Sequence, residues 1–181
     1  GGRPDSQFHR RRPRRPRALM NESFSFDDLE FFTVGTLGPR GERVFYLQGR
    51  GDGRLVSLRL EKQQVASLAD YLTQVLDDLP EASIGPLPSD LSLREPVVAA
   101  WTVGAIGIAY SADDDRLVIV AEEMTDDDND DPAQARFTLC REQVVGLIDR
   151  ARDVVSAGRP PCPYCGSPLQ PRNGDWCACS N

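Results

Sequence analysis

Four of the five cysteines of this chain lie in its last twenty residues, CPYCGSPLQPRNGDWCACSN. Their pattern is C-x2-C-x11-C-x-C. The two thiolates of a C-x-x-C turn can bind one metal ion. Alternate residues of an extended segment point to the same side, so a C-x-C pair can present two more sulfur ligands. The spacing therefore predicts one structural Zn²⁺ ion, held by Cys162, Cys165, Cys177 and Cys179.

Paired cysteines also serve redox chemistry and disulfide bonds. A thioredoxin-like dithiol normally lies at the start of a helix, and four prolines argue against a helix in this stretch: Pro161, Pro163, Pro168 and Pro171. Disulfides are typical of oxidising compartments, whereas the polar, arginine-rich N-terminus lacks the apolar segment of a secretory signal. We therefore expect a cytoplasmic protein with zinc-bound thiolates. Four sulfur ligands leave no position for water, which favours structural over catalytic zinc.

Few other residues are suited to catalysis. The only histidine is His9, close to the N-terminus, so a histidine general base or a Ser-His-Asp triad cannot be built in the body. Neither a phosphate-binding glycine loop nor a dinucleotide fingerprint is present. The acidic run TDDDNDD, residues 125–131, lacks the glycine and glutamate of a calcium-binding EF-hand loop. We predict that the protein is not an enzyme.

Positive charge is concentrated at the N-terminus. Residues 1–19 carry seven arginines and one aspartate, a net charge of +6, so the remainder carries −13 of the total of −7. Residues 1–28 are expected to be a disordered basic arm, or a leader upstream of a start at Met20. An arm of this kind can bind nucleic-acid phosphates, and the arginines available are Arg10, Arg11, Arg12, Arg14, Arg15 and Arg17. The chain has 20 arginines and a single lysine, Lys62, and we infer no function from this ratio.

An internal repeat organises residues 29–157. The segment FTVGTLG (32–38) recurs as WTVGAIG (101–107), and LRLEKQQVASLADYL (58–72) is similar to FTLCREQVVGLIDRA (137–151). Between these segments each half has a β-rich run. We predict two βββα units, residues 29–80 and 97–157, joined by a proline-rich linker at 81–96 and followed by a zinc-ribbon-like tail at 158–181.

The periodicity of apolar residues supports these elements. RLVSLRL (54–60) alternates as a half-buried strand does. Helical spacing relates Val65, Leu68, Ala69, Leu72, Val75, Leu76 and Leu79, and likewise Val144, Leu147, Ile148, Ala151 and Val155. Because the strands are grouped before each helix, the predicted class is α+β, with a mainly antiparallel sheet or half-open barrel and two packed helices.

The ordered set of motifs resembles a known family. The segment 31–38, VFYLQ (44–48), LEKQQVASLADYL (60–72), WTVGAIGIAY (101–110) and the closing CPYCG are similar to uncharacterised actinobacterial proteins. That family is catalogued as domain of unknown function three-zero-nine-zero, and also as a repeat protein. The resemblance covers about residues 29–181. It implies a tail reading Gly-His-x-Cys, where this chain has GDWC, so Asp175 stands at the position of a histidine ligand and is an alternative fourth ligand to Cys179.

Together these observations predict a zinc-stabilised adaptor or regulatory module that binds another macromolecule, most simply a protein. One alternative is a nucleic-acid-binding protein that uses the zinc ribbon and the basic arm. Another is an enzyme that uses carboxylates and is linked to phosphate metabolism, since the resemblance implies gene neighbours similar to phosphatases and kinases. No apolar run approaches the roughly 20 residues that span a bilayer, so no membrane partner is expected. The sequence predicts neither the partner nor the oligomeric state.

Overall fold

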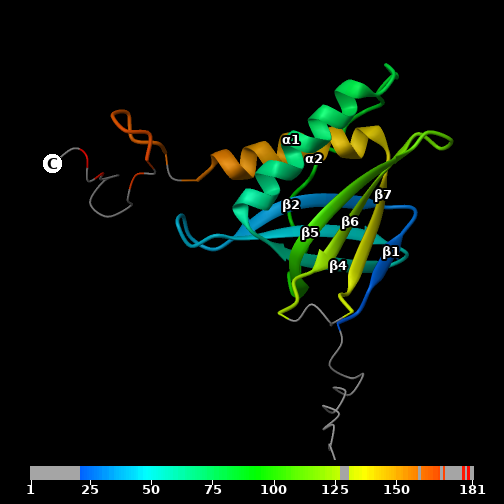
Figure 1. The fold of residues 1–181 in the computed structure, drawn as a ribbon, viewed down its shortest axis with the longest axis horizontal. Coiled ribbons are helices and arrows are strands. Elements are labelled where there is room, and N and C mark those ends of the chain that lie inside the picture. Colours follow the sequence, from blue (N-terminus) through cyan, green and yellow to red (C-terminus); the bar gives the residue numbers. More distant parts are fainter. Residues whose placement is uncertain are drawn as a thin grey trace, which may run out of the picture.

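The described part of the chain contains seven strands and two helices (Figure 1). The computed structural model describes residues 21–126, 131–158, 160–167, 169, 177 and 179. The elements in chain order are β1 (Phe24–Phe26), β2 (Phe31–Leu37), β3 (Val44–Gly51), β4 (Arg54–Leu60), α1 (Lys62–Asp78), β5 (Ala99–Ser111), β6 (Arg116–Glu123), β7 (Gln134–Leu139) and α2 (Arg141–Ser156). The predicted mixed α+β class is confirmed.

All seven strands form one open sheet in the order β1-β7-β6-β5-β4-β3-β2. Hairpin neighbours within β2–β3–β4 and within β5–β6–β7 pair antiparallel, whereas β4 pairs with β5 and β1 with β7 in parallel. The sheet is therefore mainly antiparallel, as predicted. After β1, three strands and a helix occur twice in succession. That the two halves are copies of one unit stays a prediction.

The sheet curls strongly. Its two edge strands, β1 and β2, are joined by residues 27–30 alone. A flat sheet of seven strands would be about 29 Å wide, whereas a link of this length reaches at most about 18 Å. The curl brings β7 over β3, and an added Cβ at Gly49 would lie 2.8 Å from the Phe137 ring. Phe137 also packs against the rings of Phe26 and Phe32, with centroids 5.7 and 4.9 Å away.

Both helices cover one side of the curled sheet and cross each other (Figure 1). α1 buries Val65, Leu68, Ala69 and Leu72, and α2 lies against β2 and β6. The helical spacing of the sequence thus identifies the buried faces, although Val154 of α2 is buried more fully than the predicted Val155. Burial of these apolar stripes supplies most of the stability of such helices.

Part of the segment between α1 and β5 lies on the other face of β2–β4. Thr33 donates a hydrogen bond to the Leu91 carbonyl (2.6 Å). The buried side chain of Gln48 accepts from the Arg94 N–H (2.7 Å) and donates to the Arg94 carbonyl (2.9 Å). The predicted linker 81–96 therefore includes a strap that covers the first half of the sheet on that face. Among the residues that the structure describes, no similar segment covers the second half.

The sheet begins before the expected boundary at residue 29. Residues 24–26 form β1, and Phe26 is buried in the core. The segment before it is also attached, since the Glu22 carbonyl accepts a hydrogen bond from the Trp101 indole (3.0 Å) and the Ser23 hydroxyl accepts from the Gln134 N–H (3.0 Å). A three-residue strand is too short to produce a periodicity in the sequence, which is why the pattern does not reveal it.

Candidate metal centre

The cysteine tail follows α2 after a few residues. Pro160 and Pro161 cannot continue the helix, and the described part of the tail lies beyond the C-terminal end of α2 (Figure 1). The first cysteine pair lies in a tight turn, in which the Gly166 N–H donates to the Cys162 carbonyl (2.9 Å) and the Cys162 N–H donates to the Ser167 carbonyl (2.8 Å). Gly166 has φ +74°, a conformation that favours glycine.

The four predicted cysteines come together. The sulfur atoms of Cys162, Cys165, Cys177 and Cys179 all lie within 4.8 Å of one another. The Cys162 and Cys179 sulfurs are 3.4 Å apart, and those of Cys165 and Cys177 are 3.5 Å apart. Four sulfurs at about 2.3 Å from a tetrahedral zinc ion are separated by about 3.8 Å. The cluster is therefore compact enough to surround one ion.

The cluster is not a pair of disulfides. No disulfide bond joins these four cysteines in the structure, and the two shortest sulfur separations exceed the S–S bond length of about 2.05 Å by more than 1 Å. Two of the four, Cys162 and Cys177, are buried, whereas Cys165 and Cys179 are exposed. One side of the cluster thus faces solvent, which gives an ion access to it.

Local hydrogen bonds set the acidity of the thiols. Ser167, through its hydroxyl and its backbone, lowers the pKa of Cys165 to about 6, and the backbone at Tyr164 and Cys165 lowers the pKa of Cys162. The pKa of Cys179 is raised instead, because its thiol donates to the Cys165 and Cys162 sulfurs. Neighbouring thiolates repel one another, so only a bound cation allows all four to ionise together.

The donor set fits a soft or borderline metal ion. Four thiolates in tetrahedral proximity are typical of structural zinc sites and of iron–sulfur proteins. If zinc is bound, Cys162, Cys165, Cys177 and Cys179 would fill its coordination sphere, so the ion would stabilise the tail and leave no position for a substrate. The four cysteines that the sequence singles out lie together in the structure, and their role as metal ligands stays a prediction.

The fifth cysteine, Cys140, and the remaining candidate residues lie apart from this cluster or outside the described chain. Cys140 is half-buried at the N-cap of α2 and does not join the cluster. Burial raises the pKa of its thiol. Asp175, the alternative fourth ligand, lies outside the described residues. So do the six arginines proposed for nucleic-acid binding: Arg10, Arg11, Arg12, Arg14, Arg15 and Arg17.

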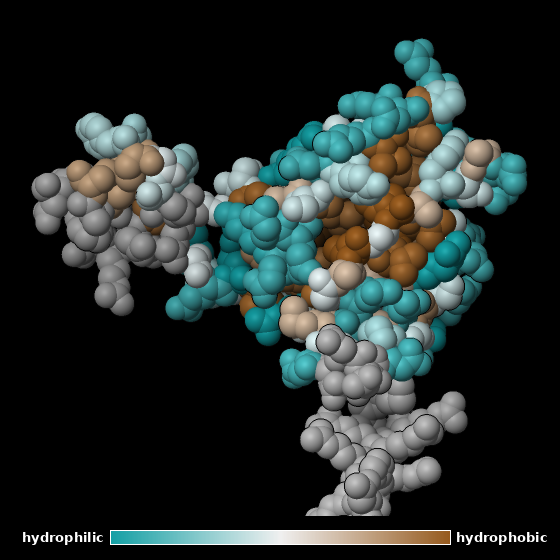
Figure 2. Space-filling model, in the orientation of Figure 1, coloured by the Kyte–Doolittle hydropathy of each residue, from teal (hydrophilic) through white to brown (hydrophobic). Residues whose placement is uncertain are grey.

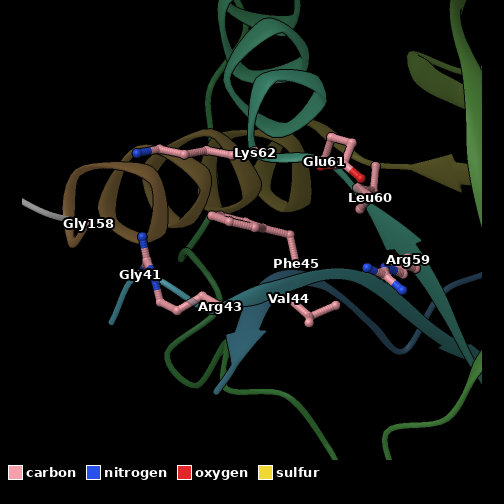
Figure 3. Close-up of a pocket in the computed structure, with 9 residues that line it drawn as sticks. All are labelled: Gly41, Arg43, Val44, Phe45, Arg59, Leu60, Glu61, Lys62 and Gly158. Atoms are coloured by element: carbon pink, nitrogen blue, oxygen red, sulfur yellow. The ribbon is translucent and has the colours of Figure 1, made fainter. Parts of the chain in front are cut away.

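The sequence prediction misses a cavity near the start of the tail. The cavity has a volume of about 300 Å³ and is lined by Arg43, Arg59, Lys62 and Gly158, among others (Figure 3). One signal was available, because Lys62 is the only lysine in a chain with 20 arginines. The arginines gave no signal, since nothing in their spacing shows that the fold brings them beside Lys62.

Among the helices of the described residues, none combines the length and the apolar character needed to cross a membrane.

Comparison with known proteins gives a match to a family. No curated protein and no solved structure matches the chain. A family model does match, over residues 24–177, from the strand β1 to the third cysteine of the cluster. The chain therefore belongs to the family described as Protein of unknown function (DUF3090).

Proposed function

We propose that this protein is a non-enzymatic binding module whose tail is folded by one zinc ion and contacts a partner protein. The observation that carries the proposal is the approach of four cysteine sulfurs to within 4.8 Å of one another. The tail has few residues with which to form an apolar core, and in such small modules the metal supplies much of the folding free energy.

The turn between the first two ligands presents an aromatic side chain. Tyr164 lies between Cys162 and Cys165 and is 83% exposed, the highest exposure among the large hydrophobic residues of the described chain. Tyrosine is enriched at the centres of protein interfaces because it buries a large, rigid surface at low entropic cost. Binding of zinc would fix the backbone turn that carries this ring, which lowers the entropic cost of contact with a partner.

The body offers a second surface that supports a protein partner. Figure 2 shows a hydrophobic area over β5 and β6, and the exposed side of β5 includes Ala105, Gly107 and Ala109. This is the half of the sheet that the strap does not cover. Contiguous exposed apolar surface is typical of protein interaction sites.

Nucleic acid is the second candidate, because an exposed tyrosine can also stack on a base. Charge favours a protein. The segment 160–167 contains no arginine or lysine, and residues 20–181 carry a net charge of −13. Phosphate contacts supply most of the affinity for nucleic acid, so an acidic chain whose tail has little positive charge is poorly suited to this role.

The first test is metal content. Native mass spectrometry of the full chain, purified without added metal, is expected to show one zinc ion per chain that is lost on chelation and in Cys177→Ser. Cys140→Ser is the matched control and is expected to retain the ion. A chain that carries no metal, and whose thiols form a reversible disulfide, would contradict the proposal in favour of redox chemistry.

The second test concerns the partner. Proteins that co-purify with the zinc-loaded chain are expected to be lost in Tyr164→Ala but retained in Tyr71→Ala, since Tyr71 is 51% exposed on α1 and serves as an aromatic control. Fluorescence anisotropy with single-stranded oligonucleotides tests the alternative. Binding that disappears in Tyr164→Ala, with no protein retained, would assign nucleic acid as the partner and contradict the proposal.

A further inference from the structure

A second site lies where β3, β4 and α1 meet the C-terminal end of α2. The cavity described above is lined by three cationic side chains, Arg43, Arg59 and Lys62, and by one carboxylate residue, Glu61. Its lining is thus net positive in a chain whose total charge is −7. Cations gathered in one cavity repel one another, and a bound anion would relieve this repulsion.

Two of the cations converge on one point. A Cβ added at Gly158 would lie 3.0 Å from the Lys62 ammonium nitrogen and 3.1 Å from Nη2 of Arg43. The two nitrogens are therefore at most about 6 Å apart, a separation at which like charges repel one another. Figure 3 shows both side chains reaching the Gly158 end of the cavity, with Arg59 at the opposite end and the Phe45 ring between them.

The contacts of these three side chains do not neutralise their positive charge, which is therefore available to a ligand. Arg43 donates from Nη1 to the Val154 carbonyl (2.8 Å), and its guanidinium lies over the Phe45 ring, 5.3 Å from the centroid. These contacts fix the guanidinium and do not neutralise it. Within the described chain, the side chains of Lys62 and Arg59 have neither an ion pair nor a hydrogen bond.

We propose that this cavity binds a small molecule that carries a phosphate group. Lys62 and Arg43 hold the phosphate at the Gly158 end, since two cations at most about 6 Å apart can both reach one oxyanion with several acceptor oxygens. The volume of about 300 Å³ is at the lower end for ligand pockets and suits a small phosphate ester rather than a dinucleotide.

Gly158 has a role in this arrangement. It leaves open the space into which the heads of Lys62 and Arg43 point, and its carbonyl accepts hydrogen bonds from Arg40 Nε (3.3 Å) and Nη2 (3.1 Å). A methyl group at residue 158 would lie 3.0 Å from Lys62 Nζ and 3.1 Å from Arg43 Nη2, so it would crowd the two cationic heads at this end of the cavity and would leave every charge in place. Gly158→Ala therefore tests the shape of the site separately from its charge.

The single lysine provides a direct measurement. A neutral succinimidyl ester of acetate acylates the ε-amine of Lys62, forming an amide and releasing N-hydroxysuccinimide, and peptide mass spectrometry separates this product from that of the α-amine. Inorganic phosphate is expected to slow acylation of Lys62 saturably, by about tenfold at saturation. Sodium chloride at the same ionic strength is expected to have little effect, because general screening does not occupy the site.

Matched variants complete the test. Gly158→Ala is expected to lose most of the protection by phosphate, whereas Gly107→Ala, where an added Cβ would meet nothing within 4 Å, is expected to keep it. If glycerol 3-phosphate protects Lys62 at a lower concentration than inorganic phosphate does, the ligand is a phosphate ester. If the two protect Lys62 equally, the ligand is the free anion. Neutral glycerol should not protect.

Protection no greater than that by chloride, or equal protection in Gly158→Ala, would overturn the proposal. The cations would then serve only to stabilise the negative C-terminal end of α2. This inference is independent of the metal centre, and acylation of Lys62 reports on it whether or not the tail carries zinc.

Discussion

The sulfur atoms of Cys162 and Cys179 lie 3.4 Å apart, although 17 positions separate the two residues in the chain. The C-terminal pair of cysteines therefore folds back onto the turn of the first pair. No part of the body contributes a ligand to this cluster within the described chain. The body, in turn, has its own core, which is built from β1 to α2.

We expect Cys162→Ser to remove the metal from the tail and to leave the body folded. Structural zinc contributes about 10–16 kcal/mol of apparent binding free energy in small zinc peptides, so the tail would lose its fold while the separate core persists. Circular dichroism should retain the helical signal, and native mass spectrometry should show the loss of zinc. Global unfolding of this variant would show instead that the tail is an integral part of the body.

Gly49→Ala is expected to destabilise the protein by about 1–3 kcal/mol, the usual cost of overpacking a core. The added methyl would lie 2.8 Å from the Phe137 ring and 3.3 Å from the Phe32 ring, inside the curled sheet. The free energy of unfolding in urea measures this cost. Gly107→Ala is the control, because it adds the same methyl to a strand in open space, and we expect it to be neutral or slightly stabilising.

Gln48→Leu is expected to lower the free energy of unfolding by about 1–3 kcal/mol, because it leaves buried polar groups without partners. The Gln48 amide donates to Ser57 Oγ (3.0 Å) and joins β3 to both backbone groups of Arg94 in the strap. Urea denaturation is again the measurement. Gln63→Leu, an exposed change on α1, should alter the stability by less than about 0.5 kcal/mol. Equal effects of the two changes would contradict a structural role for the strap.

Asp115 is expected to make stability depend on pH in the acid range. Its carboxylate accepts hydrogen bonds from the Tyr110 hydroxyl (2.8 Å) and Arg141 Nε (2.9 Å), which lower its pKa below 3.8 in the folded state. Since the unfolded state binds the proton more readily, this stabilisation is complete above about pH 5 and is lost as pH falls from about 4 through the lower folded-state pKa.

The measurement is urea unfolding of the wild type and Asp115→Asn between about pH 6 and pH 3. The variant should lose less stability than the wild type over this range. Asparagine tolerates positive φ values, and φ is 50° at Asp115, so backbone strain does not confuse the comparison. Asp113→Asn lies in the same turn without these hydrogen bonds and should behave as the wild type does. Identical pH dependence in Asp115→Asn would exclude this carboxylate as the source.

The sequence by itself determined which cysteines gather in the tail and the order of most elements. The four cysteines could be recognised as a candidate site because their pattern is local: Cys162 and Cys165 lie within one turn, and Cys177 and Cys179 lie close together in the chain. The helices could be recognised for the same reason, since the apolar stripe of α1 is a property of consecutive residues. The strand β1 escaped prediction because three residues carry no period.

Only the tertiary structure decided how distant segments meet. The curl that places Phe137 over Gly49 depends on sheet pairing and on the short link between β1 and β2. The strap is held by Gln48, whose partners are 46 positions away in the chain. The surroundings of Lys62 are decided in the same way, because its ammonium group lies close to Arg43 and Gly158 only after α1 and α2 have packed. Local patterns report on residues that are neighbours in sequence, whereas these contacts exist only between residues that the fold makes neighbours.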